Sequence, residues 1–185
     1  MKIVETPIEG LFIIEPQVFG DNRGYFLETF RESFLKEAGI NTAFVQDNES
    51  RSIRGVVRGL HYQINPFAQA KLVRVVSGTV FDVAVDLRRN SPTFKKWFGL
   101  ELSGENKKQL YIPRGFAHGF SVLSETAVFA YKCDAYYQQN AERGILFNDP
   151  ELNINWKLSS EEMIVSGKDQ AHHLLKDADF NFDEL

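Results

Sequence analysis

Short apolar runs separated by turn residues dominate the first two thirds of the chain. In many of these runs apolar and polar positions alternate with a period of two, which is typical of β-strands. The predicted strands cover residues 11–15, 25–30, 44–50, 55–64, 71–76, 80–87, 97–102, 109–112, 119–123 and 126–133. Short strands at a spacing of roughly ten residues predict an all-β sandwich or barrel, and a double-sheet jelly roll is one such architecture.

Helical signals are few. Residues 31–38 predict a helix that ends at Gly39, a residue that readily adopts the left-handed conformation found after helix ends. Residues 158–162 predict a helical turn capped by Ser159 or Ser160. We therefore expect an all-β fold with a few short helices.

The run 80–87 shows the clearest alternation in the chain. Val83 and Val85 lie on one predicted face, and Asp82 and Asp86 lie on the other. A jelly roll has a cleft between its sheets, where a polar side chain is costly unless it is paired or used. Asp82 therefore either faces solvent or points into the cleft, where it is paired or has a function.

Composition narrows the possible classes of protein. The length of 185 residues suits a single domain, 1–185, and a net charge of −4 argues against a nucleic-acid partner. A phosphorylated ligand must then be bound by local groups of Lys and Arg. Cys133 is the only cysteine, the N-terminus lacks a signal-peptide core, and no apolar run approaches the ~20 residues that span a bilayer. We expect a cytoplasmic protein without a membrane contact.

His61 is the first candidate for chemistry, because its side chain titrates near neutral pH and lies within a predicted strand. A histidine close to the cation Arg58 suits proton removal from an anionic substrate, although a histidine packed in a sheet is the alternative. A regular strand places side chains three residues apart on opposite faces. If both serve one site, the strand must be irregular at Gly59 or Leu60.

A metal site is a second possibility. Residues 113–118 carry the spacing P-x-G-x-x-H, which resembles a motif of cupins in which the histidine binds a metal. The other ligands of those proteins come from an H-x-H pair and a glutamate. Here His61 has no second histidine at that spacing, and His172 and His173 are adjacent, so a strand would point them to opposite faces. His61 and His118 alone fall short of three ligands, so we expect no metal and no cofactor.

A set of motifs in a fixed order carries a closer resemblance. The motifs lie at residues 20–26, 46–48, 58–63, 71–75, 113–120, 131–133, 148–150 and 154–156. Together they resemble the dTDP-4-dehydrorhamnose 3,5-epimerases over nearly the whole chain. The resemblance implies a metal-free cupin jelly roll that inverts C3 and C5 of dTDP-4-dehydro-6-deoxy-D-glucose. The product is dTDP-4-dehydro-L-rhamnose, formed by deprotonation beside the C4 ketone and reprotonation from the opposite face.

The same resemblance implies four catalytic residues. His61 is the expected base, Asp169 orients it, Tyr131 returns a proton from the other face, and Lys71 stabilises the enolate oxygen. Each has a plain structural alternative. Asp169 could cap a helix or turn, Tyr131 could be a core residue that shares a strand face with Cys133, and Lys71 could be the solvated start of a strand.

Further residues match substrate contacts of the family. Arg23, Arg58 and Lys168 suit a diphosphate, because cationic side chains bind its oxygens. Phe19 and Tyr137 suit the flat thymine ring. The other expected contacts are Glu28, Gln46, Asn48, His118 and Glu142.

The resemblance also implies a homodimer in which residues 19–25 reach the site of the neighbouring subunit. Three other functions stay open from the residues alone. They are an epimerase or ketoisomerase that acts at one centre, a non-catalytic cupin that binds sugar nucleotides, and a metal-dependent cupin oxygenase.

Overall fold

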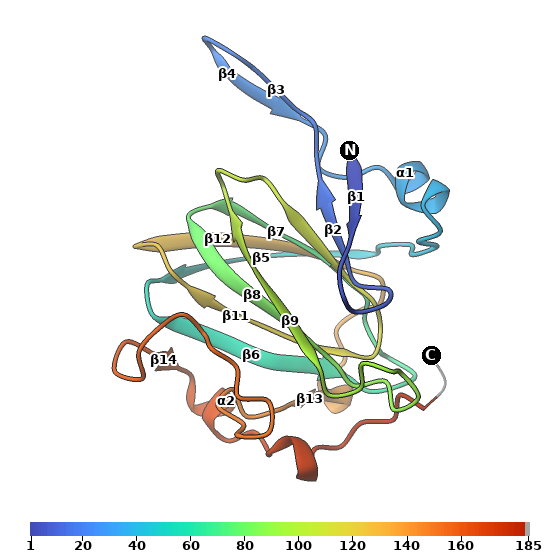
Figure 1. Ribbon diagram of the computed structural model, residues 1–185, viewed down its shortest axis with the longest axis vertical. Helices are drawn as coiled ribbons and strands as arrows, with labels where there is room; N and C mark the ends of the chain where they lie inside the picture. The colour runs from blue at the N-terminus through green and yellow to red at the C-terminus, as the bar shows by residue number, and fades with distance from the viewer. Residues whose placement is uncertain (184–185) are drawn as a thin grey trace.

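The structure is a computed structural model that describes residues 1–183, and two sheets facing each other form most of it (Figure 1). The strands of the first sheet, in spatial order, are β1 (Lys2–Glu5), β2 (Phe12–Glu15), β10 (Gln109–Ile112), β7 (Lys71–Ser77), β12 (Thr126–Cys133) and β5 (Gln46–Ile53). The strands of the second sheet are β13 (Glu142–Gly144), β6 (Val56–Gln63), β11 (Phe116–Val122), β8 (Thr79–Asp86) and β9 (Trp97–Ser103), with β14 (Ile164–Val165) parallel to β6. This double-sheet jelly roll confirms the predicted all-β fold.

Strand β8 is buried on both of its faces. Ala84 packs inward in the core that includes Phe129 of the first sheet, whereas Val83 and Val85 pack outward. Asp82 lies on the inward face with Ala84 and is fully buried. The solvent-facing alternative for Asp82 is therefore wrong, because the opposing sheet covers the face that carries it.

The chain after β13 covers the outer face of the second sheet (Figure 1). It contributes the buried side chains Ile145, Leu152, Trp156, Leu175, Phe180 and Phe182 to that outer core. Full burial of one large apolar side chain stabilises a fold by about 1.5–3 kcal/mol, so these contacts hold the segment firmly against the sheet. As a result, the short helix α2 (Gly167–Gln170) lies against β6.

The predicted helix over residues 31–38 is confirmed as α1 (Glu32–Glu37), and Gly39 follows it with φ +83°. The predicted helical turn over 158–162 is a single hydrogen-bonded turn, in which the backbone N–H of Glu162 donates to the carbonyl of Ser159, and it does not extend into a helix. The backbone N–H and the hydroxyl of Ser159 both donate to the Glu162 carboxylate, which closes the turn before β14. The other helical segments are the 3₁₀ turns η1 (Gln139–Ala141) and η2 (Leu175–Asp177).

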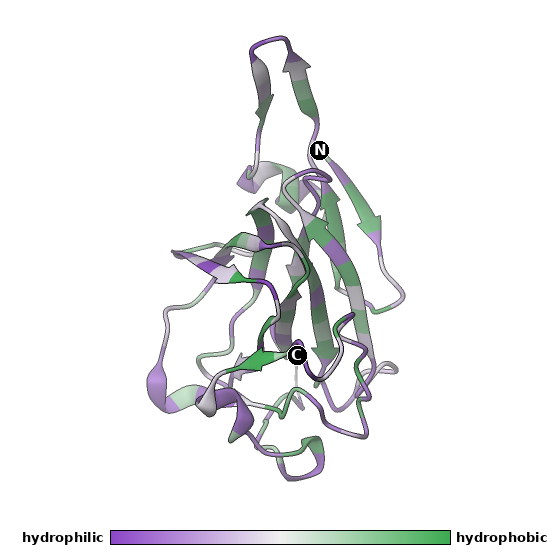
Figure 2. Ribbon diagram, turned by 90° about the vertical axis from the view of Figure 1, so that its left-hand side faces the viewer, coloured by the Kyte–Doolittle hydropathy of each residue, from purple (hydrophilic) through white to green (hydrophobic). Residues whose placement is uncertain are grey.

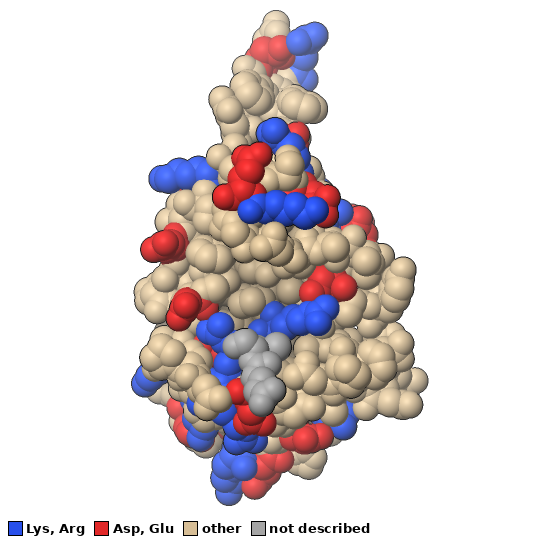
Figure 3. Space-filling model, turned by 90° about the vertical axis from the view of Figure 1, so that its right-hand side faces the viewer, with Lys and Arg blue, Asp and Glu red and all other residues tan. Residues whose placement is uncertain are grey.

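No helix within residues 1–183 is long and apolar enough to cross a membrane. On the face shown in Figure 3, acidic and basic side chains are interspersed.

A two-stranded hairpin of β3 (Val18–Asp21) and β4 (Gly24–Leu27) projects from the two sheets (Figure 1). The predicted strand over 25–30 ends at Leu27, because β3 offers no partner beyond the Val18–Leu27 pair. Figure 2 shows apolar stretches in both arms and a hydrophilic tip. Phe19 and Phe26 expose 55% and 69% of their surfaces, so the arms carry apolar side chains that residues 1–183 leave uncovered.

Strand β6 is irregular at the predicted place. Arg58 pairs with Phe120 and His61 pairs with His118, so two residues of β6 oppose one residue of β11. Gly59 adopts φ +128°, and its peptide bond to Leu60 is cis. Because Phe120 and His118 both contact Phe129 of the opposing sheet, Arg58 and His61 face the space between the sheets.

Candidate active site

A cavity of about 340 Å³ opens between the two sheets. Its lining comprises Gln46, Asn48, His61, Tyr62, Gln63, Gln69, Lys71, Tyr131, Cys133, Tyr137 and Glu142. Seven of the residues predicted to serve the site are in this set: His61, Lys71, Tyr131, Gln46, Asn48, Tyr137 and Glu142. They lie on β5, β6, β7, β12 and β13 and in the loop after β12, and the jelly roll topology brings these segments of both sheets together.

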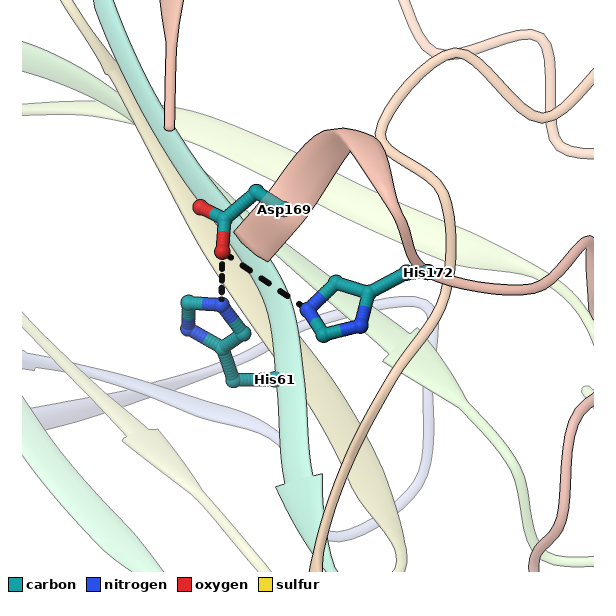
Figure 4. Close-up of side chains that lie close together, drawn as sticks. All are labelled: His61, Asp169 and His172. Atoms are coloured by element: carbon teal, nitrogen blue, oxygen red, sulfur yellow. Dashed lines mark hydrogen bonds and ion pairs between the residues drawn. The ribbon is translucent and has the colours of Figure 1, made fainter. Parts of the chain in front are cut away.

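The imidazole of His61 is oriented by a hydrogen bond with the carboxylate of Asp169 (Figure 4). Its Nε2 atom lies 2.8 Å from Oδ1 of Asp169, and Oδ2 of Asp169 accepts a hydrogen bond of 3.2 Å from the backbone N–H of Gly59. Asp169 is buried, whereas His61 keeps partial access to the cavity. When Nε2 carries the proton, Nδ1 is left as the acceptor of the imidazole.

Asp169 keeps its side chain available because another residue caps α2. Ser166 is the N-cap, and its hydroxyl accepts a hydrogen bond from the backbone N–H of Asp169. Burial raises the pKa of the Asp169 carboxyl, but the hydrogen bonds from His61 and Gly59 outweigh it and hold that pKa below its ordinary value. The group is therefore an anion at neutral pH.

Tyr131 and Lys71 come from the first sheet, opposite His61. Tyr131 lies on β12 and shares its inward face with Phe129 and Cys133, as predicted from strand parity. Burial raises the pKa of the Tyr131 hydroxyl, and the neighbouring Cys133 and Glu142 add to the effect. The phenol therefore keeps its proton well above neutral pH.

Lys71 begins β7 directly opposite Cys133 of β12. Burial lowers the pKa of its ammonium group, while Cys133, Asp82 and Glu142 counteract that effect. Within residues 1–183, no carboxylate lies within ion-pair distance of Lys71. An ammonium group without a direct counter-ion can stabilise a negative charge that develops in the cavity.

His118 is buried beside the cavity and is paired with Asp82. Its Nε2 atom lies 2.9 Å from Oδ2 of Asp82, and burial lowers the pKa of the imidazole. The other carboxylate oxygen of Asp82 has no hydrogen-bond partner among the described residues. Asp82 thus lies on the cleft side, in contact with a predicted site residue.

The rim of the cavity is a hydrogen-bonded cluster. Oε2 of Glu142 accepts hydrogen bonds of 2.8 Å from the Tyr137 hydroxyl and 2.6 Å from Nζ of Lys168. Gln46 donates to Asn48 over 3.1 Å and accepts from the backbone N–H of Tyr137. These groups therefore bring two amides, a phenol, a carboxylate and an ammonium to the mouth of the site.

Arg58 reaches across the cleft to the first sheet, where its Nε donates to Oγ of Ser52 over 3.1 Å. Its charge lowers the pKa of Tyr131, although less than burial raises it.

Three predicted substrate contacts lie elsewhere. Phe19 and Arg23 belong to the projecting hairpin, where Arg23 is paired with Asp21, and Glu28 is paired with Arg31 on the surface.

His172 is a neighbour of the site that the sequence did not predict. Its ring lies 5.5 Å from the ring of His61, and its Nε2 atom lies 3.6 Å from Oδ1 of Asp169. Strand parity with His173 was the wrong criterion, because His172 lies just beyond Ala171, the C-cap of α2, and not in a strand. The relevant signal was the three-residue spacing from Asp169, which places two side chains on one side of a helical turn.

A buried carboxylate behind an imidazole, with a phenol and an uncompensated ammonium on the opposite wall, suits proton transfer beside a carbonyl. On a cupin jelly roll this arrangement defines an isomerase that moves protons at carbon.

Comparison with known proteins identifies the family. The family described as dTDP-4-dehydrorhamnose 3,5-epimerase matches residues 5–177. The dTDP-4-dehydrorhamnose 3,5-epimerase of Pseudomonas aeruginosa is 53% identical over 180 residues, which is 97% of this chain and 98% of that protein. The chain belongs to the dTDP-4-dehydrorhamnose 3,5-epimerase family and is an epimerase with that activity.

Solved structures agree with this assignment. The dTDP-4-dehydrorhamnose 3,5-epimerase of Elizabethkingia anophelis superimposes with a TM-score of 0.92 at 57% identity, covering 96% of this chain and 97% of that one. A 3,5-epimerase from Legionella pneumophila, solved in complex with dTDP-4-keto-L-rhamnose, also gives a TM-score of 0.92, at 53% identity and coverages of 96% and 94%. The predicted cupin fold and epimerase activity are therefore confirmed.

Proposed function

We propose that His61 is the base with which this epimerase removes the protons at C3 and C5 of dTDP-4-dehydro-6-deoxy-D-glucose. The observation that carries the proposal is the hydrogen bond between Nε2 of His61 and the buried Asp169. It favours the tautomer whose Nδ1 can accept a proton, and the carboxylate stabilises the imidazolium that forms. The same arrangement serves both carbons, because each lies beside the C4 ketone.

Lys71 stabilises the enolate. Removal of a proton beside the ketone moves negative charge onto its oxygen, and a cation in a water-poor cavity lowers the energy of that charge. Lys71 lines the cavity and has no carboxylate within ion-pair distance in the described chain, so its ammonium is available for this oxygen. A lysine paired with a carboxylate would serve less well, because the partner would already offset its charge.

Tyr131 delivers the proton on the opposite face of the sugar. Its strand β12 belongs to the first sheet, and β6 with His61 belongs to the second, so the two groups approach a ligand from opposite walls. Inversion needs this arrangement, because the proton must leave from one face and return on the other. The raised pKa of Tyr131 keeps it protonated until that step.

The remaining polar groups bind the dTDP part of the substrate. Arg58 and Lys168 supply positive charge for the diphosphate, and Tyr137 offers a flat face to thymine. The other predicted contacts on this chain are Gln46, Asn48, His118 and Glu142. The bound dTDP-4-keto-L-rhamnose in the Legionella relative supports a dTDP-sugar as ligand.

The hairpin of β3 and β4 completes the site of a second subunit in a homodimer. Its exposed aromatic arms, with Phe26 69% exposed, need a covering surface that the described part of this chain does not provide. Phe19 and Arg23 belong to this hairpin, which projects from the two sheets (Figure 1). In the dimer they contact the nucleotide bound by the neighbour. This explains why these two predicted substrate contacts lie in the hairpin, whereas most of the others lie at the cavity.

The protein works in the cytoplasm. Its single cysteine, Cys133, is buried beside Lys71 and cannot form an internal disulfide. A fold without disulfides suits a reducing compartment. Cell fractionation with detection of the protein tests this location.

Deuterium exchange tests the central proposal. In D₂O, the unmodified protein should introduce deuterium at both C3 and C5 of the sugar. The variant His61→Asn should introduce it at neither carbon while still binding dTDP. The variant His173→Asn is the control, because His173 is exposed and lies beyond the residues that line the cavity. Exchange by His61→Asn at a rate near that of the unmodified protein would show that another group is the base.

A further inference from the structure

The side chains of His61, Asp169 and His172 converge on a small volume (Figure 4). The donor atoms of His61, Asp169 and His172 all lie within 4.8 Å of one another. Oδ1 of Asp169 is the shared point, 2.8 Å from Nε2 of His61 and 3.6 Å from Nε2 of His172. Two imidazoles and one carboxylate are the ligands of many protein zinc sites.

The spacing of these atoms suits a transition-metal ion. Bonds of about 2.0–2.1 Å at tetrahedral angles place neighbouring ligand atoms roughly 3.3 Å apart. The two measured distances to Oδ1 of Asp169 lie on either side of that value. Small side-chain rotations of His61 and His172 would therefore bring all three atoms into the first shell of one ion.

His172 provides an independent indication of a ligand. Its side chain is 13% exposed, yet its Nε2 atom is buried and has no hydrogen-bond partner among the described residues. Position 144 is a glycine, and a Cβ atom there would overlap the His172 ring.

We propose that His61, Asp169 and His172 form a binding site for a divalent transition-metal ion of the Zn²⁺ class, and that occupancy inhibits the epimerase. Imidazole ligands favour Zn²⁺, Co²⁺ or Ni²⁺ over Mg²⁺ and Ca²⁺, which prefer oxygen. The inhibitory part rests on the proposed role of His61 as the base.

The inhibition follows from the different roles of Nδ1 and Nε2 in the imidazole of His61. In the proposed catalytic tautomer the proton is on Nε2 and the lone pair of Nδ1 accepts the substrate proton. A metal bound at Nε2 uses the lone pair of that atom, so the ring proton moves to Nδ1. The ring neither gains nor loses a proton, but Nδ1 now carries the proton and can no longer accept one from the substrate. Asp169 is at the same time diverted from the imidazole to the ion.

Direct binding tests the site without reference to activity. Metal-free protein is titrated with Co²⁺, and the visible absorption of the bound ion is followed. Zn²⁺ is then added to displace it. We expect one Co²⁺ per chain and an affinity that falls by at least about tenfold in His172→Asn. His173→Asn is the matched control and should bind as the unmodified protein does, because the exposed His173 is absent from the cluster.

Equal Co²⁺ affinity in the unmodified protein and in correctly folded His172→Asn overturns the site, as does the absence of binding to the unmodified protein. Far-ultraviolet circular dichroism establishes that each variant is folded. Zn²⁺ inhibition is measured against the metal-free rate of each variant and should weaken in His172→Asn in parallel with binding. Binding without inhibition would overturn the inhibitory part alone. An active His61→Asn variant would instead overturn the role of His61 as base, whatever the Co²⁺ titration shows.

Discussion

Asp169 bonds His61 through one carboxylate oxygen and the backbone N–H of Gly59 through the other. A single side chain from the C-terminal segment therefore bonds both the imidazole of His61 and the irregular part of β6. These two hydrogen bonds keep the carboxylate ionised despite its burial, and they make Asp169 the best place to separate orientation of the proposed base from binding.

Replacement of Asp169 by asparagine should lower kcat by about 10²–10⁴-fold and leave KM within a few-fold. The amide keeps the shape of the side chain but cannot stabilise an imidazolium, and it can select the wrong tautomer of His61. Steady-state kinetics on the dehydro sugar measures both parameters. Asp177→Asn, an exposed carboxylate in η2, is the control. A rate within threefold of the unmodified protein would contradict the proposed role.

Tyr131→Phe should separate proton exchange from inversion. Without the acid on the first sheet, His61 can still remove a proton and return it from the same wall. We expect deuterium from solvent to enter the substrate faster than the inverted product forms, which nuclear magnetic resonance can follow in one sample. Tyr136→Phe is the matched control, since Tyr136 is 65% exposed. Parallel loss of exchange and inversion would indicate that Tyr131 acts before the enolate forms.

The rate should fall at alkaline pH because of Lys71. Burial holds the pKa of this lysine below its ordinary value of 10.5, whereas the pKa of Tyr131 is raised above 10.0. As pH rises through the lowered pKa of Lys71, the ammonium group loses its charge and kcat declines. Lys71→Arg keeps its charge and should move this decline to higher pH. An unchanged pH profile in an active Lys71→Arg variant would assign the decline to another group.

Mixed dimers test the proposal that the hairpin of β3 and β4 contributes Arg23 to the site of the neighbouring subunit. Arg23→Ala and His61→Asn should each be weakly active alone. Co-expressed in equal amounts, they should recover about a quarter of normal activity, because half of the dimers are mixed and each has one intact site. That site combines His61 of one chain with Arg23 of the other. If Arg23 served its own chain, neither site of a mixed dimer would be complete, and co-expression would recover nothing.

Gly59→Ala should destabilise the fold by at least about 1–3 kcal/mol. Gly59 adopts φ +128°, and an added Cβ would lie 2.6 Å from Cα of Gly119 on the neighbouring strand. Urea unfolding measures the loss. Gly167→Ala is the comparison, because no atom lies within 4 Å of a Cβ at that position. Similar stability of the two variants would mean that β6 relaxes more easily than its close contact with β11 indicates.

Strand parity predicted much of the site geometry. It placed Tyr131 with Cys133, and it required the irregularity at Gly59 that brings Arg58 to the face of His61. Alternation works here because a side chain in a packed sheet has only two directions. The partners of His61 needed the family resemblance, since Asp169 is 108 residues away and local patterns carry no information about that contact.

Local rules worked only in part in the C-terminal segment. The turn predicted at Ser159 forms, but it stops after one hydrogen bond because the chain continues into β14, which pairs with β6. His172 was judged as a strand residue, although it follows α2 and turns toward Asp169. Packing against the outer face of the second sheet decides the path of this segment, and that surface comes from strands far earlier in the chain.

The covering segment after β13 also has a consequence for biosynthesis. The ribosome completes both sheets, with His61, Lys71 and Tyr131, before it reaches Asp169. A nascent chain therefore contains His61 well before the carboxylate that bonds it has been made. The contact between the two residues forms only when the last part of the polypeptide folds back over β6. On the proposed mechanism, catalytic competence arrives only at that stage of synthesis.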